Sequence, residues 1–469
     1  MNRSQAVMLC SLLLGAVILA VILFMPLYIG MADNGDFPRI LSSGGIAPLS
    51  DLFTYEQKYF KYAHSQYDYG RFGIDYASSQ AIVVFTAGLL GRLWNSSYFD
   101  MHVLGALYSI VLLIVLAVLI HAARGRLWLQ ITLAASILWV YFDIGYTAYF
   151  QSFYGEPVSL LSLLLTISMA FMLTKQPRPA VWLLYILFAA AWILSTSKLQ
   201  NAVIGLVITL YCIRIYRLRS DHLWKYTVAG GCILMIVSAG LMYGLGPKEL
   251  KQINLYQTIF YGILKDTDDP VRDLRALGIP ERYQVLAGTN YFQKDTAISQ
   301  DSPELTRDVY SRLGHADIVK YYATHPKRIV DKLQAVARNA STIRPYYLGN
   351  FELEAGKPPG AMSFTYSSWS EGKKQWIPRS LMFYVAFYAM YGIVIGYEWF
   401  RCRIKRSILE IMLLIAGISI VAAAIPLIGD GEADLGKHLF LFNAAFDMML
   451  IAAGCWFIYV IRYLLGNKR

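Results

Sequence analysis

The sequence has few charged residues and few cysteines for its 469 residues. Asp, Glu, Lys and Arg make up 16% of it and hydrophobic residues 57%, a balance that excludes a soluble protein with a solvated surface. All five cysteines, Cys10, Cys212, Cys232, Cys402 and Cys455, lie within or next to long apolar runs. We therefore expect no disulfide in the parts of the chain outside a membrane.

Two kinds of pattern are also absent from the sequence. There is no Gly-rich fingerprint that binds nucleotides, which argues against a soluble nucleotide-sugar domain. There is no internal repeat and no low-complexity tract, which argues against transporters built from inverted repeats. No cofactor is expected, and the sequence leaves open whether a divalent metal ion takes part.

The sequence is rich in apolar runs near the ~20 residues that cross a bilayer as a helix. They predict an all-α integral membrane protein with about ten transmembrane helices. The runs are 6–29, 101–122, 127–148, 157–174, 180–197, 201–216, 226–245, 378–400, 407–427 and 439–464. Only Arg3 precedes the first run and no small-residue cleavage site follows it, so we expect an uncleaved anchor.

Basic residues in the short loops indicate the orientation, with both termini in the cytoplasm. They are Arg3, Arg124, Arg126, Lys175, Arg178, Arg214, Arg217, Arg219, Lys225, Arg401, Arg403, Lys405, Arg406, Lys468 and Arg469. The apolar segment 81–94 contains Arg92, and counting it as a span would reverse every later loop. It is therefore predicted to be an interfacial or re-entrant helix. The net charge of +11 follows from this pattern and requires no nucleic-acid partner.

The predicted topology divides the chain into three parts. An N-terminal transmembrane module, residues 1–245, includes a first outer loop at 30–100 in which interfacial helices are expected. Residues 246–376 form a large extracytoplasmic loop domain, and apolar positions at 3–4 spacing in 301–340 predict a small helical cap. Residues 377–469 form a C-terminal transmembrane module.

The first candidate site residues directly follow the first span. Asp33 and Asp36 lie in the segment Met31-Ala-Asp-Asn-Gly-Asp-Phe-Pro-Arg39. Carboxylates so near hydrocarbon are unfavourable unless something uses them, and the turn between these two allows both to point to one place. We predict that this loop carries a catalytic carboxylate and that Arg39 binds substrate.

Further candidates lie at other predicted outer turns. Asp68 and Arg71 belong to a Gly-jointed aromatic segment, 67–75, which either faces a sugar or is an ordinary surface loop. Tyr154 and Glu156 precede an apolar helix. Glu156 is predicted to be catalytic and Tyr154 to bind substrate, with a helix-capping carboxylate as the alternative for Glu156.

The remaining candidates are mostly cations. Lys198 and Gln200 occupy the turn 195–201, where a lysine that merely reaches the interface is the alternative. Lys437 and His438 open the last span, and because a helix N-terminus favours anions, this pair predicts a phosphate-binding corner. Arg344 lies in the large loop, in Ile343-Arg-Pro-Tyr-Tyr-Leu-Gly-Asn350.

Carboxylates, cations and aromatic residues on one membrane face match the chemistry of sugar transfer from a polyprenyl-phosphate donor. An acceptor hydroxyl needs a general base as it attacks the anomeric carbon. The departing phosphate is stabilised by cations and helix N-termini. Since the tail of the donor lies in lipid, such a site must lie at the interface.

In three segments and in the order of its spans and loops, the sequence resembles the GT-C class of polytopic glycosyltransferases. The segments are Asp-Asn-Gly-Asp-Phe, Ser-Phe-Tyr-Gly-Glu-Pro and Arg-Pro-Tyr-Tyr-Leu-Gly-Asn. Within that class they are similar to the bacterial glycan-biosynthesis hexose transferases called WsfD-like. The resemblance implies a polyprenyl-phosphate-linked hexose donor and a catalytic acid in the first outer loop, here Asp33 or Asp36. The chain lacks the adjacent Asp-Glu pair of the protein-mannosyltransferase branch, which leaves open which aspartate acts. We expect a cell-membrane hexosyltransferase that acts with inversion, on the extracytoplasmic face, on a cell-surface glycan or lipid acceptor.

Two other functional classes remain open. An oligosaccharide ligase or polymerase would use His and Arg residues in the large loop, where His315, His325 and Arg328 are available. A lipid-linked sugar flippase or other transporter would use ionisable residues inside the spans, here chiefly Asp143 and Asp447.

Overall fold

The computed structural model describes residues 1–401 and 404–466 and is almost entirely helical over them. This confirms the predicted all-α membrane fold. Four residues used in the sequence analysis, Cys402, Arg403, Lys468 and Arg469, lie outside the described residues.

Each of the ten predicted apolar runs forms a helix. These are α1 (Arg3–Leu23), α5 (His102–Ala122), α6 (Leu127–Tyr141), α8 (Glu156–Leu173), α9 (Val181–Thr196), α10 (Ala202–Tyr216), α11 (His222–Leu245), α18 (Leu381–Arg401), α19 (Arg406–Gly429) and α21 (Phe440–Leu464). In the described part of the chain, eight helices are long and apolar enough to cross a membrane, or nine with one bent pair. One of the eight is α10 together with the preceding turn η3 (Leu199–Asn201), which makes 18 residues. The 16-residue α9 is shorter than that and packs against α8, α10 and α11.

The bent pair lies where the predicted run 127–148 does not continue as one helix. The segment Ile144–Gln151, made of α7 (Ile144–Thr147) and the 3₁₀ turn η2 (Ala148–Gln151), turns by 55° from α6. Asp143 lies at the bend, and its carboxylate accepts a hydrogen bond from the backbone N–H of Gly145 at 2.7 Å. This side chain caps α7, as Asp commonly does at a helix start, so a new helix begins here.

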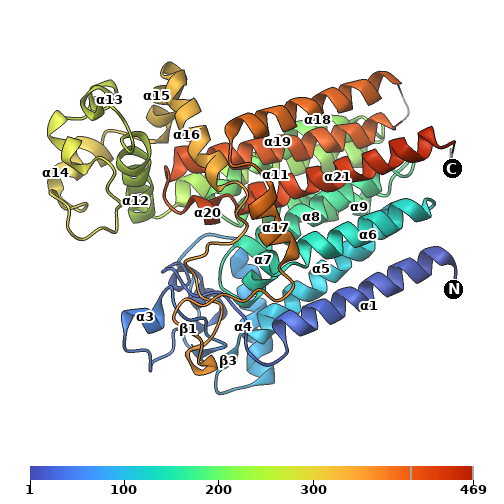
Figure 1. The fold of residues 1–469 in the computed structure, drawn as a ribbon, viewed down its shortest axis with the longest axis horizontal. Helices are drawn as coiled ribbons and strands as arrows, with labels where there is room; N and C mark the ends of the chain where they lie inside the picture. The colour runs from blue at the N-terminus through green and yellow to red at the C-terminus, as the bar shows by residue number, and fades with distance from the viewer. Residues whose placement is uncertain (402–403, 467–469) are drawn as a thin grey trace.

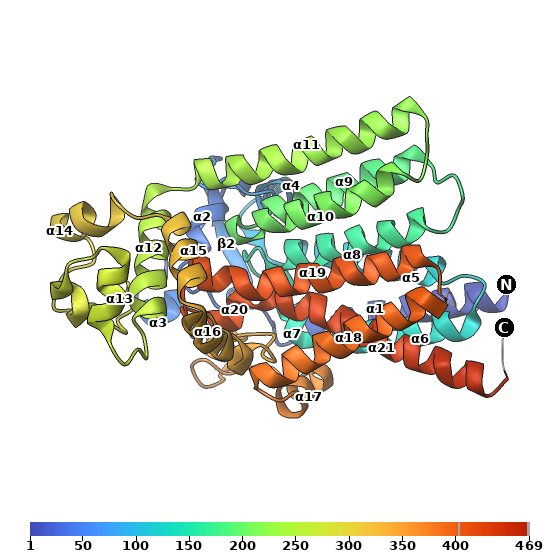
Figure 2. The same ribbon diagram turned by 90° about the horizontal axis from the view of Figure 1, so that it is seen from above.

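The helices run side by side as one bundle with two distinct ends. Figures 1 and 2 show both termini at one end and the loops of residues 30–100 and 246–376 at the other, which we call the loop end. Because both termini lie at the same end, the chain must cross the bundle an even number of times. The short basic loops after α5, α8 and α10 lie at the end with the termini, as the positive-inside pattern requires. That this end faces the cytoplasm stays a prediction.

The first loop, residues 30–100, folds as a small mixed unit against the loop end. It contains α2 (Pro38–Leu41), η1 (Ser42–Gly44), α3 (Tyr55–Lys58), α4 (Gln80–Trp94) and the strands β1 (Ile46–Ala47), β2 (Gln66–Tyr69) and β3 (Phe99–Asp100). The strands form an antiparallel sheet in the order β1-β2-β3, with Ala47 opposite Asp68 and Tyr67 opposite Phe99. Its buried side chains join the main hydrophobic core.

The segment 81–94 is the helix α4, which packs on the first loop. At 15 residues and 1.5 Å per residue it is shorter than the hydrocarbon core of a bilayer. A side-chain carbon at Gly88 would lie 2.1 Å from the carbonyl oxygen of Gly44, so only glycine permits this close approach. The guanidinium group of Arg92 donates to the carbonyls of Gly44 and Gly45 at 2.9 and 2.6 Å. These contacts agree with an interfacial helix.

Residues 248–339 form the helical cap with a hydrophobic core of its own. It comprises α12 (Lys248–Thr258), η4 (Ile259–Ile263), α13 (Pro270–Leu277), η5 (Glu281–Leu286), α14 (Pro303–Leu305), η6 (Thr306–Tyr310), α15 (His315–Thr324) and α16 (Pro326–Asn339). The helices predicted for 301–340 are present. The cap meets the bundle where Gly262 lies against Gly431.

The return segment from the cap to α18 packs instead on the bundle and the first loop. It contains η7 (Leu353–Ala355) and α17 (Ser368–Trp376). The backbone N–H groups of Trp369 and Ser370 donate to the carboxylate of Asp143 at 2.9 and 3.1 Å. The ammonium group of Lys373 lies 2.5 Å from the carboxylate of Asp447 in α21, and both side chains are fully buried. An ion pair thus attaches α17 to the transmembrane helices.

Candidate active site at the loop end

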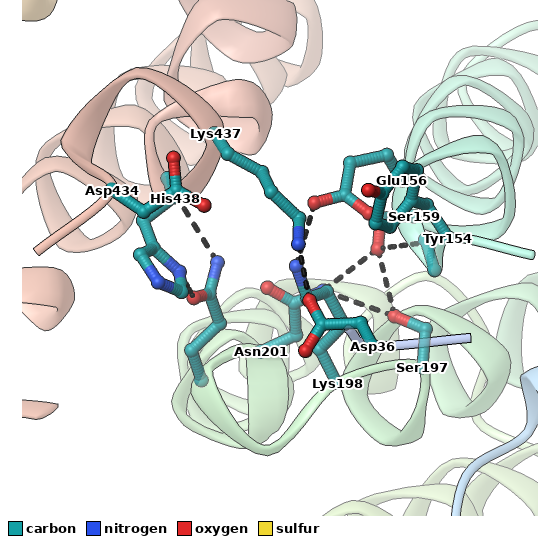
Figure 3. Close-up of polar contacts among 12 residues, drawn as sticks. Asp36, Tyr154, Glu156, Ser159, Ser197, Lys198, Asn201, Asp434, Lys437 and His438 are labelled. Carbon is teal, nitrogen blue, oxygen red and sulfur yellow. Dashed lines mark hydrogen bonds and ion pairs between the residues drawn. The ribbon is translucent and has the colours of Figure 1, made fainter. Parts of the chain in front are cut away.

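Four segments that are distant in sequence converge at the loop end of the bundle. They are the turn 33–39 of the first loop, the start of α8, the turn 197–201 between α9 and α10, and residues 430–438 before α21. Figure 3 shows the side chains of Asp36, Glu156, Lys198 and Lys437, one from each segment, pointing toward one another. The predicted topology put these segments on one face, and the structure brings them into contact.

The carboxylate of Asp33 is buried within its own turn. One oxygen accepts hydrogen bonds from the backbone N–H groups of Gly35 at 2.8 Å and Phe37 at 3.1 Å. The second oxygen accepts no hydrogen bond from any described residue. Burial raises the pKa of Asp33 to about 6, against the two backbone hydrogen bonds, which lower it. Asp33 therefore loses its proton at a higher pH than an ordinary aspartate.

Asp36 has the opposite electrostatic environment. One of its oxygens lies 2.6 Å from the guanidinium group of Arg39, and the other binds the ammonium group of Lys437. Burial would raise the pKa of Asp36, but the attraction of Lys437 and Arg39 outweighs it and holds that pKa well below its usual range. Asp36 is therefore a permanent anion and a weak base.

Tyr154 connects the Asp33 turn to Lys437. Its hydroxyl donates to the carbonyl of Ala32 at 2.8 Å and accepts from the backbone N–H of Asn34 at 2.9 Å. The ammonium group of Lys437 lies 4.3 Å from the centre of its ring, which is a cation–π contact. Burial raises the pKa of Tyr154, so its hydroxyl stays protonated.

Glu156 and Lys198 form a second ion pair beside the first, at 2.7 Å. Glu156 is 1% exposed at the first turn of α8, and its second carboxylate oxygen is buried without a hydrogen-bond partner among the described residues. Gly155 allows the close packing of this turn, because a side-chain carbon there would lie 3.0 Å from Lys198. Asn201 donates to Ser159 and Ser197 and holds the two turns together.

The corner predicted at residues 437–438 is filled by side chains of the protein. Lys437 is 2% exposed on the four-residue helix α20 (Leu435–His438). Burial opposes its charge, but Asp36, Glu156 and Asp434 outweigh burial and raise the pKa of Lys437. The imidazole of His438 lies 2.9 Å from Gln200 through Nδ1 and 2.8 Å from Asp430 through Nε2.

Two acids at this corner, Asp430 and Asp434, were not selected from the sequence. Asp434 adopts a left-handed conformation, with φ 46°. Its carboxylate accepts hydrogen bonds from the hydroxyl of Tyr347 and from Asn34. The available signal was a run of three acids, at 430, 432 and 434, directly before Lys437 and His438. Burial raises the pKa of Asp430, although His438 lowers it.

Three predicted substrate-binding residues do not join this cluster. Asp68 on β2 accepts from the backbone N–H of Ser50 at 2.9 Å, and Arg71 is exposed on the following loop. Arg344 is completely buried and donates to Asn350 at 3.1 Å and to the carbonyl of Ser363 at 2.7 Å.

Arg344 nevertheless supports the Asp33 turn through Asn350. The side chain of Asn350 donates to the carbonyl of Gly30 at 2.7 Å, and its backbone carbonyl accepts from Gly30 at 2.9 Å. The backbone N–H of Ala32 donates to the carbonyl of Gly349 at 2.9 Å. The segment 343–350 therefore fixes the backbone that leads into Asp33.

Residues 1–401 and 404–466 contain no group of three His, Cys, Asp or Glu side chains placed to hold a metal ion. In the cluster, Lys437 pairs with Asp36 and Lys198 pairs with Glu156.

The sequence matches a known protein family. A family model described as YfdI N-terminal transmembrane domain matches residues 1–468. The chain belongs to this family. No curated protein and no solved structure matches it. The YfdI match spans essentially the whole chain, so the spans, the first loop and the cap all belong to the region that defines the family.

The candidate site of this YfdI-family protein has three chemical features. A carboxylate with a pKa of about 6 accepts a proton at neutral pH. Two lysines, Lys198 and Lys437, lie at helix ends, and each is paired with a carboxylate. The cluster lies at the end of an apolar bundle, beside the loops of residues 30–100 and 246–376.

Proposed function

We propose that the protein transfers a hexose from a polyprenyl-phosphate donor to a cell-surface glycan or lipid acceptor, on the extracytoplasmic face of the cell membrane and with inversion. The observation that carries the proposal is the position of Asp33. Its carboxylate keeps one oxygen without a hydrogen bond from any described residue, and it lies on a turn that also holds Asp36, the partner of Lys437. Burial raises its pKa to about 6. The YfdI family match and the bundle support a membrane protein of glycosyltransferase type.

In the proposed reaction, the acceptor oxygen attacks the anomeric carbon of the donor from the face opposite the phosphate. Asp33 accepts the proton of the acceptor hydroxyl through its open carboxylate oxygen. The bond between the anomeric carbon and the phosphate oxygen breaks, and the phosphate leaves with the electron pair. The products are the inverted glycoside and polyprenyl phosphate.

Lys437 and Lys198 are assigned to the leaving phosphate. Both are paired with carboxylates, Asp36 and Glu156, so that the site is close to neutral before the donor arrives. A phosphate oxygen offers each lysine a further acceptor, and the interaction grows as negative charge develops on the leaving group. The exposed guanidinium of Arg39 is a third donor at the rim.

Asp33 is preferred over the other two carboxylates as the base. Both oxygens of Asp36 are bound by cations, and its pKa is low. Glu156 is paired with Lys198 on one oxygen. Its buried second oxygen keeps Glu156 as the next candidate for the base.

Residues that a ligase or a transporter would use make internal contacts in this protein. For a ligase, His325 stacks on Tyr321 at 4.4 Å and Arg328 pairs with Asp273, both inside the cap. For a transporter, Asp447 accepts from Lys373 and from the side chains of Tyr146 and Trp369. These internal contacts favour the glycosyltransferase proposal.

The deciding experiment uses the full chain, purified and placed in nanodiscs, with a synthetic polyprenyl-phosphate hexose carrying a labelled sugar. We expect labelled glycoside and free polyprenyl phosphate, and NMR of the product should give the anomeric configuration opposite to that of the donor. Deletion of the gene, followed by analysis of the surface glycan, identifies the hexose that is lost and hence the donor to supply. No transfer and no loss of a hexose would overturn the proposal.

A further inference from the structure

Four aromatic rings form a row beside the Asp33 turn. The ring centres of Tyr55 and Tyr59 lie 5.2 Å apart, those of Tyr55 and Phe60 6.1 Å, and those of Phe60 and Tyr347 6.1 Å. Tyr55 is 67% exposed and Tyr347 43% exposed. We call these four residues the aromatic platform.

Backbone hydrogen bonds attach the aromatic platform to the site. The N–H of Phe60 donates to the carbonyl of Asp33 at 2.8 Å, and the carbonyl of Phe60 accepts from Gly349 at 2.9 Å. At the last ring of the row, the hydroxyl of Tyr347 donates to Asp434, which also accepts from Asn34 at 3.4 Å. The platform is thus fixed to the turn of Asp33 at two points.

The backbone at Phe60 is strained. Its φ of 67° lies in the left-handed region, which glycine adopts readily and a bulky residue rarely does. Such strain persists where the surrounding structure requires it and gathers at ligand-binding sites. Here the two backbone bonds of Phe60 enforce the conformation, and it places the ring between Tyr55 and Tyr347.

We propose that the aromatic platform binds the acceptor as a carbohydrate chain, with sugar rings stacked on Tyr55, Phe60 and Tyr347 and one hydroxyl held at Asp33. The C–H face of a sugar ring is apolar and slightly positive, and the face of an aromatic ring is negative, so the two attract. The inference rests on the proposed function and narrows its acceptor to a glycan of several sugars.

The position of the platform favours a glycan over a lipid acceptor. In both views of the fold, α3 lies beyond the ends of the bundle helices, on the same side as the cap (Figures 1 and 2). Lys198 and Lys437 lie at the helix ends themselves. A water-borne chain therefore reaches Asp33 along the platform, while the lipid-borne phosphate reaches the lysines from the bundle.

The test measures acceptor binding and transfer separately in the full chain in nanodiscs. The probe is a set of oligosaccharides released by mild acid from the cell's own surface polysaccharide, and saturation-transfer NMR detects its binding without donor. The variants are Tyr55→Ala and Phe60→Leu, which remove one ring each. The control is Phe292→Ala, which removes a comparably exposed ring from the cap. Hydrolysis of the donor by water reports whether each variant keeps its folded donor site.

We expect both platform variants to raise the acceptor KM roughly threefold to tenfold, the usual value of an aromatic contact. Donor hydrolysis should be unchanged, and Phe292→Ala should behave as the unmodified protein. Two results would overturn the proposed role of the platform in acceptor binding. One is transfer with unaltered acceptor KM in both variants, and the other is no oligosaccharide binding by the unmodified protein. Oligosaccharide binding without any transfer of hexose would instead overturn the glycosyltransferase proposal and keep the platform as a glycan-binding surface.

Discussion

The ammonium group of Lys437 binds the carboxylate of Asp36, which precedes it by 401 residues in the chain. The pair connects the first loop to the last turn before α21, and Lys437 is buried there while Asp36 is about one-third exposed. A lysine inside an apolar bundle needs such a counter-ion. The pair therefore closes the loop end, and in the proposed function it also supplies the cation for the phosphate.

Replacing Lys437 with Met should separate these two roles. We expect the donor Kd to rise about 10- to 100-fold, which corresponds to the usual free-energy contribution of a charge-assisted hydrogen bond. The thermal midpoint should fall, because Asp36 loses its counter-ion. In the double variant Lys437→Met, Asp36→Asn, the midpoint should recover while donor binding stays weak. Donor titration and thermal unfolding in detergent measure both quantities, and an unchanged Kd in Lys437→Met would remove the lysine from the phosphate site.

The isosteric change Asp33→Asn should lower kcat by about two to four orders of magnitude, the usual value of a positioned base. The amide oxygen of Asn still accepts the hydrogen bonds of Gly35 and Phe37, so the turn and the donor Kd should be preserved. Asp36→Asn should mainly weaken donor binding. Single-turnover kinetics with labelled donor distinguish the two effects. If both variants transfer hexose at nearly normal rates, Glu156 becomes the candidate base and the ligase reading gains weight.

The pH profile of the reaction should report the titration of Asp33. A base acts only when deprotonated, so kcat/KM should rise about tenfold per pH unit below about 6 and level off above it. Since Lys437 lowers the pKa of Asp33, Lys437→Met should move the midpoint to higher pH. Since Asp36 raises it, Asp36→Asn should move the midpoint to lower pH. Midpoints that stay fixed in both variants would assign the titration to another group.

The orientation of the bundle can be checked with reporter fusions. An alkaline-phosphatase reporter fused after Gly246, at the loop end of α11, should be active because the predicted topology puts that end outside the cytoplasm. The same reporter fused after Arg219, between α10 and α11, should be silent. The reverse result would place the candidate site in the cytoplasm and contradict a lipid-phosphate donor on the outer face.

The fold was largely predictable because bilayer length and positive charge constrain it directly. All ten apolar runs form helices, and the segment 81–94 forms a 15-residue helix whose Arg92 bonds to the first loop. That this helix lies at the interface stays a prediction. The bend at Asp143 was not predicted. Hydropathy changes little there, and the bend depends on a side chain that caps the next helix and accepts bonds from Trp369, 226 residues later.

The candidate site was predictable in location and only partly in its contacts. Topology placed Asp36, Glu156, Lys198 and Lys437 on one face, and the structure joins them in two ion pairs. Which cation binds which carboxylate depends on how the loops pack, and no local pattern encodes it. Charge alone suggested that Arg344 binds substrate, but its guanidinium is buried and bonds to Asn350 instead.

The buried pair of Lys373 and Asp447 bears on how the chain is made. Lys373 belongs to the segment that returns from the cap, and Asp447 lies within the last span. Synthesis runs from the N-terminus, so Lys373 leaves the ribosome before Asp447. In the predicted orientation Lys373 belongs to a loop that is translocated before α21 inserts. An isolated α21 would carry an uncompensated carboxylate into lipid. Insertion of the final helix is therefore coupled to delivery of α17 across the membrane, and a chain whose return segment is held back should fail to complete its last crossing.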